Sequence, residues 1–135
     1  MPEESFDEQA SLRGIHVFLV VDDPESRELI KTVLEYVGAL VSPVASARGA
    51  LAALETIRPG VLLADLSGDG ESAVALIERV RTLGGRELPA IVVTARGGRD
   101  ERQRLLKAGF HQHMLKPVDP WELCRLVASL AERGS

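Results

Sequence analysis

The sequence predicts an α/β fold in which an open, doubly wound parallel sheet is covered by helices on both faces. Two observations lead to this prediction. Short apolar segments alternate along the chain with longer segments whose apolar residues recur at helical spacing. Several of the short segments are apolar at every position, which is typical of strands buried on both faces of a parallel sheet.

The first predicted unit is a strand followed by a helix. Residues 17–21 form a β-branched, apolar run, and residues 24–37 carry a helical apolar stripe. Asp23 suits the start of this helix as a cap, Pro24 fits its first turn, and Gly38 ends it. The stripe comprises Leu29, Ile30, Val33, Leu34 and Val37.

The next strand is predicted at an edge of the sheet. Residues 39–44 contain Pro43, which has no amide hydrogen to donate to a neighbouring strand. A short helix over 46–57 then begins with a capping serine. The apolar run 61–64 is a buried strand that ends at Asp65.

The second half of the chain continues the alternation. The last helix has three of the residues that favour a helix start, namely Asp119 as a cap, Pro120 in the first turn and Glu122 as a capping-box acid. The predicted elements are a helix over 71–83, a strand over 90–94, a charged helix over 99–108, a strand over 111–115 and a helix over 119–132.

Composition indicates one domain and excludes several functions. A length of 135 residues with 45% hydrophobic content allows one buried core. The longest apolar runs, such as 17–21, are five residues long, far below the roughly 18 residues that span a bilayer. A net charge of −4 gives no general attraction to phosphate backbones, so we expect no nucleic acid and no membrane as partner. A single cysteine and an acidic start without a signal-peptide pattern predict a cytoplasmic protein.

The domain is expected over residues 14–133, after a flexible tail. The tail over residues 1–13 is acidic and offers too little apolar surface to offset the entropy of ordering.

Polar residues stand at the ends of the predicted strands, where doubly wound sheets bind their ligands. Clustered carboxylates favour a compensating cation, and oxygen ligands favour Mg²⁺. Asp65 could act as a nucleophile toward a phosphodonor, while Mg²⁺, Lys116 and Thr94 neutralise the oxygens of the transferred group. The residues at these strand ends are Asp22, Asp23, Asp65, Thr94 and Lys116.

Four motifs, in order, make residues 14–133 similar to the receiver domain of bacterial two-component response regulators. The resemblance implies a flavodoxin-like five-stranded sheet of order 2-1-3-4-5 with five helices. It also implies that Asp65 is the phosphoacceptor, Thr94 the switch hydroxyl and Lys116 the phosphoryl-contacting residue, with a cis Lys116-Pro117 bond. The motifs are Leu-Val-Val-Asp-Asp at 19–23, Leu-Leu-Ala-Asp at 62–65, Val-Val-Thr-Ala at 92–95 and Lys116-Pro117.

The acids after the first strand depart from the receiver pattern of two or three carboxylates. A gap-free register places Val21 at the first acid position and Asp22 at the second, so that Asp22 and Asp65 bind Mg²⁺ and a water-mediated ligand is missing. A one-residue deletion would instead make Asp22 and Asp23 the pair. We take Asp23 as the second choice, because it is well placed to cap the helix.

Two further positions depart from the family pattern. The loop after Asp65 lacks the usual Met-Pro, although the backbone carbonyl of Ser67 can still bind a metal because that contact needs no particular side chain. The switch position three residues before Lys116, usually Tyr or Phe, is His113, whose charge can depend on pH.

The resemblance implies a signalling function. A histidine kinase or phosphotransfer protein would phosphorylate Asp65, and the domain would switch conformation and signal to a downstream protein, with a homodimer also compatible. It would not be an enzyme, beyond self-phosphorylation and self-dephosphorylation. Either a stand-alone receiver or a fragment of a hybrid kinase is expected.

Two other functions are weighed against this one. The first is a pseudo-receiver that binds proteins without phosphorylation, which Val21, the altered loop and His113 motivate. The second is a haloacid-dehalogenase-like phosphatase, which is disfavoured because Ser67 stands where its second Asp would be.

Other motifs are assigned no chemistry. A calcium loop starting at Asp65 fails because Leu76 occupies its twelfth position. His111 and His113 would share a strand face, but no third zinc ligand is near in sequence. Cys124 is expected to be buried. Trp121 is expected either to be exposed as an interface residue or to pack on its own loop.

Overall fold

The computed structural model describes residues 11–66, 70–83 and 87–134, and their five strands form one parallel sheet. The strand order is β2-β1-β3-β4-β5, which confirms the predicted topology. The strands are β1 (His16–Val21), β2 (Leu40–Val44), β3 (Val61–Asp65), β4 (Ala90–Thr94) and β5 (Gln112–Leu115). The helices are α2 (Pro24–Tyr36), α3 (Ala47–Ala53), α4 (Gly70–Leu83), α5 (Arg99–Ala108) and α6 (Pro120–Gly134).

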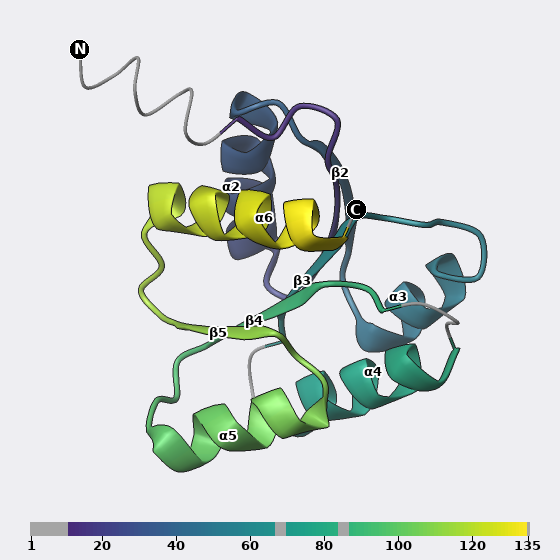
Figure 1. The fold of residues 1–135 in the computed structure, drawn as a ribbon, viewed down its shortest axis with the longest axis vertical. Coiled ribbons are helices and arrows are strands. Elements are labelled where there is room, and N and C mark those ends of the chain that lie inside the picture. The colour runs from purple at the N-terminus through teal and green to yellow at the C-terminus, as the bar shows by residue number, and fades with distance from the viewer. Residues whose placement is uncertain (1–10, 67–69, 84–86, 135) are drawn as a thin grey trace.

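The sheet separates two apolar cores (Figure 1). Helices α2 and α6 cover one face, and α3, α4 and α5 cover the other. Successive residues of β1 point to opposite faces, so Leu19 belongs to the α2/α6 core and Phe18 to the opposite core. The central strands are therefore buried on both sides, as their continuous apolar runs predict.

The helix ends explain where the chain turns. Asp23 caps α2 by accepting a hydrogen bond from the Ser26 amide at 2.8 Å, and Gly38 after this helix has the positive φ of 108° that favours glycine. Helix α3 ends at Ala53, earlier than the predicted Ile57. The amides of Glu55 and Thr56 donate to carbonyls three residues back, which tightens the chain into a turn.

Three packing details differ from expectation. Leu12 lies inside the predicted tail over 1–13, yet it is fully buried and its amide donates to the Val37 carbonyl at 2.8 Å. Packed structure therefore reaches back to this residue, while 1–10 lie outside the described residues. Leu29 of the predicted inward stripe is 64% exposed. Trp121 meets the ring of Tyr36 edge to face, with centroids 6.4 Å apart, and is partly buried against the core beneath α2 and α6.

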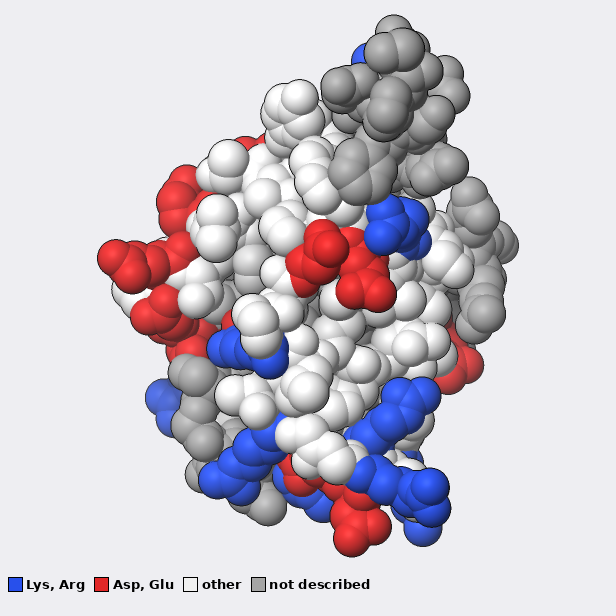
Figure 2. All heavy atoms as spheres, turned by 90° about the vertical axis from the view of Figure 1, so that its left-hand side faces the viewer, with Lys and Arg blue, Asp and Glu red and all other residues white. Residues whose placement is uncertain are grey.

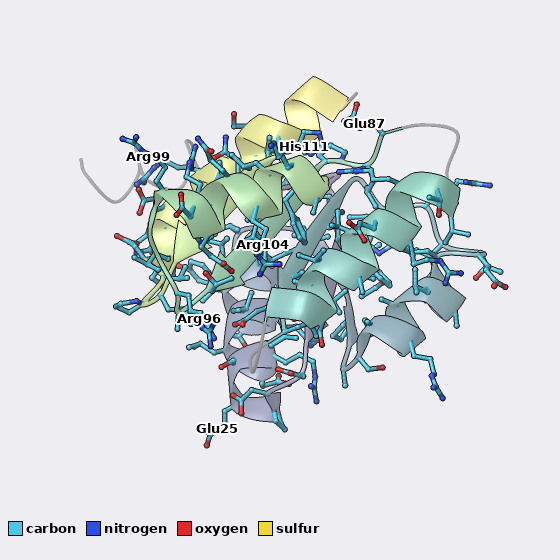
Figure 3. All side chains as sticks on the ribbon, turned by 90° about the horizontal axis from the view of Figure 1, so that it is seen from below. Glu25, Glu87, Arg96, Arg99, Arg104 and His111 are labelled. Atoms are coloured by element: carbon cyan, nitrogen blue, oxygen red, sulfur yellow. The ribbon has the colours of Figure 1, made fainter. Side chains whose placement is uncertain are left out.

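A polar network lies at the amino ends of β4 and β5, opposite the carboxyl ends of the strands. The sequence did not predict it. Arg81 in α4 donates to the carbonyls of Gly109 and Leu88, and its guanidinium lies 3.4 Å from His111 Nδ1. His111 Nδ1 also accepts from the Ala90 amide, and its Nε2 lies 3.1 Å from Glu87 (Figure 3). These contacts join α4, β4 and β5, so His111 has a structural role.

Pro43 lies in β2 at an edge of the sheet, as predicted.

Among the helices of the described residues, none has the length and apolarity required to span a bilayer.

Candidate functional site

The candidate site is built around Asp65, the last residue of β3. The residue is only 3% exposed, and Oδ1 accepts from the Lys116 ammonium at 2.9 Å. Lys116 directly follows β5, so the carboxyl ends of two strands supply the two charges, and the Lys116-Pro117 bond is cis, as the resemblance implies. Both side chains line a cavity of about 490 Å³. The fold therefore brings the Asp65 carboxylate and the Lys116 ammonium together as an ion pair.

The environment of Asp65 makes its carboxylate more basic than a free aspartate. Burial is the largest cause and raises its pKa above 3.8. Lys116 opposes this by stabilising the charged form, while the carboxylates of Asp22 and Asp23 raise the pKa further. A more basic carboxylate held beside an ammonium is suited to attack a phosphorus centre.

Asp22 and Asp23 follow β1 at the same edge of the sheet. Val21 is in register with Asp65, and the Asp22 amide lies 3.4 Å from the Asp65 carbonyl. The Asp22 side chain is exposed. Asp23 is the cap of α2, and its hydrogen bonds with Ser26 lower the pKa of this carboxyl. The structure therefore gives Asp23 a structural role beside the site, and Ser67 lies outside the described residues.

The donor set fits a magnesium ion that keeps water ligands. In the part of the chain that the structure describes, no three His, Cys, Asp or Glu side chains gather to hold a metal on protein ligands alone. Mg²⁺ commonly binds through one or two carboxylates and retains several waters. Asp65 and Asp22 would supply those carboxylates, and the repulsion that Asp22 and Asp23 exert on Asp65 favours a cation.

Thr94 and His113 form a hydrogen-bonded pair on the face of the sheet that α3, α4 and α5 cover. In the β4/β5 register Val92 pairs with His113 and Thr94 pairs with Leu115, so the Thr94 and His113 side chains share one face. Thr94 Oγ1 lies 2.7 Å from His113 Nε2 and donates to the Arg96 carbonyl at 2.8 Å. Burial lowers the pKa of His113, and the positive charge of Arg102 adds to this effect. The ring is therefore neutral at neutral pH.

Charged residues surround the site unevenly. Lys and Arg gather with a few acids at the lower end of the face shown in Figure 2, where α5 lies in Figure 1. Arg96, Arg99 and Arg102 are exposed in this region (Arg96 and Arg99 are labelled in Figure 3). The carboxylates of Asp22 and Asp23 lie at the end of β1 instead. The site thus lies between an acidic edge and a mixed but mainly basic helix.

The cavity beside Asp65 has an apolar wall that sequence reasoning did not identify. One wall comes from α2 and the other from the segment between β5 and α6. The exposed position of Leu29 could have been suspected only from its place at the margin of the helical stripe. The apolar lining comprises Leu29, Ile30, Val33, Pro117, Val118 and Pro120.

Comparisons with known proteins point to one family. Residues 17–128 match the family model of the response regulator receiver domain. An uncharacterized 14.6 kDa protein in the sodA1 3′ region of Leptolyngbya boryana is 41% identical over 118 residues, which cover 87% of this chain and 90% of that protein. The sensor histidine kinase GacS of Pseudomonas protegens is 30% identical over 93% of this chain, but the match spans only 14% of the kinase.

Solved structures share the fold. The receiver domain of the Francisella response regulator 1452 has a TM-score of 0.83 at 23% identity, covering 90% of this chain and all of that one. The receiver domain of sensor histidine kinase PA1611 from Pseudomonas aeruginosa has a TM-score of 0.74 at 30% identity and covers 88% of this chain and 98% of its own. That structure is described with a magnesium ion coordinated in its active-site cleft.

Proposed function

The chain belongs to the response regulator receiver domain family, and on this premise we propose that it is a working receiver that accepts a phosphoryl group on Asp65. Family members are signalling domains of two-component systems. The observation that carries the proposal is the buried Asp65 carboxylate held 2.9 Å from the Lys116 ammonium at the strand ends. Burying a carboxylate costs stability, so a buried carboxylate at this edge of the sheet is typical of a functional group.

The proposed transfer uses Asp65 and Lys116, whose carboxylate and ammonium lie 2.9 Å apart. An Asp65 oxygen attacks the phosphorus of a phosphohistidine, the new O–P bond forms as the P–N bond breaks, and the leaving imidazole takes a proton from water. The Lys116 ammonium then pairs with the negatively charged phosphoryl oxygens instead of the carboxylate. Asp65 and Asp22, with the Ser67 carbonyl as a further ligand, would hold Mg²⁺, which would neutralise the same oxygens. Thr94 would complete the set by turning its hydroxyl from the Arg96 carbonyl toward the phosphoryl oxygens.

The partners follow from this chemistry. A histidine kinase or a phosphotransfer protein serves as donor, and a downstream protein reads the switched state through Thr94 and His113. A cytoplasmic location is part of the proposal and is supported by the single cysteine, Cys124, which is buried and unpaired with another cysteine. The protein is then a phosphoacceptor whose own turnover is limited to gain and loss of its phosphoryl group.

Intact mass after incubation with a small phosphodonor and Mg²⁺ tests the proposal. We expect one phosphoryl group on the wild type and none on Asp65→Asn. Asp100→Asn, which removes an exposed carboxylate on α5, should label like the wild type. Labelling that persists in Asp65→Asn would overturn the assignment of this residue.

A pseudo-receiver remains the second candidate because of Val21. This buried valine, and not an acid, is in register with Asp65 at the end of β1. A folded wild type that takes no phosphoryl group from a small donor or a phosphorylated kinase, and no Mg²⁺ at millimolar concentration, would establish this alternative.

A further inference from the structure

The cavity beside Asp65 has the size and the lining of a small-molecule site. Its volume of about 490 Å³ lies within the range of about 300–1,000 Å³ that such sites occupy. Apolar side chains of α2 and of the segment between β5 and α6 form most of its wall, whereas Ser26, Asp65 and Lys116 supply its polar groups. An apolar wall with a few convergent polar groups is typical of a pocket that holds an amphipathic ligand.

The polar groups of the lining differ in depth. Asp65 is 3% exposed, whereas the Lys116 side chain is 32% exposed and Ser26 is half-buried. The head group of a ligand must therefore be slender to reach the Asp65 carboxylate. The body of the ligand would lie against the apolar side chains of Leu29 and Val33.

The charge around the cavity favours a positively charged head group. Residues 22–36, which include α2, carry five acidic and two basic side chains, and residues 116–123 on the opposite wall carry two acidic and one basic. The carboxylates of Asp22 and Asp23 also act electrostatically on Asp65, and Lys116 opposes them. Basic side chains gather instead around α5, at the lower end of the face in Figure 2. A cation is therefore attracted to this cavity, and an anion is repelled.

We propose that this cavity binds a small organic cation, a primary amine attached to an apolar body. The ammonium lies beside the Asp65 carboxylate, and the body covers the apolar wall at Leu29, which is 64% exposed. The inference rests on the proposed function in one respect only, namely that the bound amine blocks phosphorylation of Asp65. Binding itself requires no phosphodonor.

Three probes with one apolar body test the choice of head group. They are para-butylbenzylamine, para-butylbenzyl alcohol and para-butylbenzoic acid, and their binding to the full chain is followed by methyl NMR in buffer without Mg²⁺. We expect the amine to bind about tenfold more tightly than the alcohol, and the acid to bind more weakly than either. Tighter binding of the alcohol or the acid would overturn the inference, as would a failure of the amine to bind.

Two exposed leucines provide a matched pair of variants that tests the position of the ligand. Leu29→Ser removes part of the apolar wall and should weaken the amine about three- to tenfold. Leu40→Ser should change nothing, because Leu40 is 66% exposed in β2 and lies outside this lining. Asp65→Asn should weaken the amine about tenfold and leave the alcohol unchanged. Equal effects of the two leucine substitutions, or equal losses for amine and alcohol in Asp65→Asn, would contradict the proposed site.

A helical peptide with lysine among leucine residues distinguishes a small ligand from a protein partner. If this peptide displaced the amine and bound more tightly, the cavity would be a protein-docking site and the small-ligand assignment would be wrong.

Intact-mass labelling with a small phosphodonor and Mg²⁺ connects the ligand to the proposed function. Saturating amine should block labelling of Asp65, and the alcohol should not. Equal labelling with and without the amine would overturn the inference, because the ammonium would then not lie at Asp65. A protein that binds the amine as expected but takes no phosphoryl group in its absence would refute the proposed function, whereas the binding data would still support the ligand site.

Discussion

Replacing Lys116 with methionine tests how strongly the buried carboxylate depends on its partner. Methionine keeps the length and the apolar stem that lines the cavity but removes the charge. At an effective dielectric constant of about 20, unit charges 2.9 Å apart attract by roughly 6 kcal/mol. Lys116 is 32% exposed, so water screens the pair, and the variant escapes the cost of partly burying the ammonium. We expect a net loss of about 2 kcal/mol at pH 7.5.

The loss should depend on pH in one direction. Burial raises the folded-state pKa of Asp65 above 3.8, and removal of Lys116 takes away the main influence that lowers it. The charged carboxylate is then the destabilised species, so the deficit is present at neutral pH and shrinks as pH falls through the folded-state pKa toward 3.8. In an Asp65→Asn background, Lys116→Met should cost almost nothing.

Thermal and urea unfolding measure this effect. A loss of about 2 kcal/mol corresponds to a decrease of about 7 °C in Tm for a domain of this length. Lys31→Met is the matched control, because it breaks an exposed pair with Glu35 at 3.3 Å and should cost no more than about 0.5 kcal/mol. An equal loss in the presence and absence of the Asp65 carboxylate would refute the reasoning, since the loss would then come from packing.

Three other perturbations have definite expected results. Gly109→Ala should lose about 1–3 kcal/mol in urea unfolding, because φ is +137° and a Cβ would lie 3.1 Å from the Ile77 side chain, whereas Gly14→Ala, with open space around it, should lose less. Burial raises the pKa of the Cys124 thiol to about 11. The thiol should therefore react with a thiol reagent at pH 8 no faster than the protein unfolds. Rapid labelling of the folded protein would contradict this. The folded-state pKa of His113 is lowered from 6.5, so the unfolded chain binds the proton more readily and stability falls as pH drops below 6.5. In thermal unfolding, His113→Phe should lessen that fall. An unchanged dependence of stability on pH would argue against a buried neutral ring.

The strands could be predicted because their signals are local and strong, whereas the full strand order was implied by the resemblance to receiver domains. Continuous β-branched runs such as 17–21 and 61–64 have few alternatives, and Pro43 marks an edge strand. The end of α3 and the burial of Leu12 were not predicted, since both depend on contacts with distant residues such as Val37. Tertiary packing decides such boundaries.

The candidate site was partly predictable for a similar reason. Parallel strands bring their carboxyl ends together, so Asp65 and Lys116 could be placed near each other before any side chain was seen. The bond between Thr94 and His113 could not, because it depends on side-chain rotation and on a register offset of two residues between β4 and β5. Likewise, nothing in the sequence around Arg81 identifies the carbonyls to which it donates.

The sheet that divides the interior also divides the constraints on sequence change. Leu34 belongs to the core beneath α2 and α6, and Leu105 to the core beneath α4 and α5, with the strands between them. Substitutions that share no neighbours have nearly additive effects on stability. One layer can therefore accumulate changes, including those that retune a partner surface, without compensating changes in the other. The effects of substitutions on the two sides are coupled mainly at the carboxyl ends of the strands, where Asp65 lies.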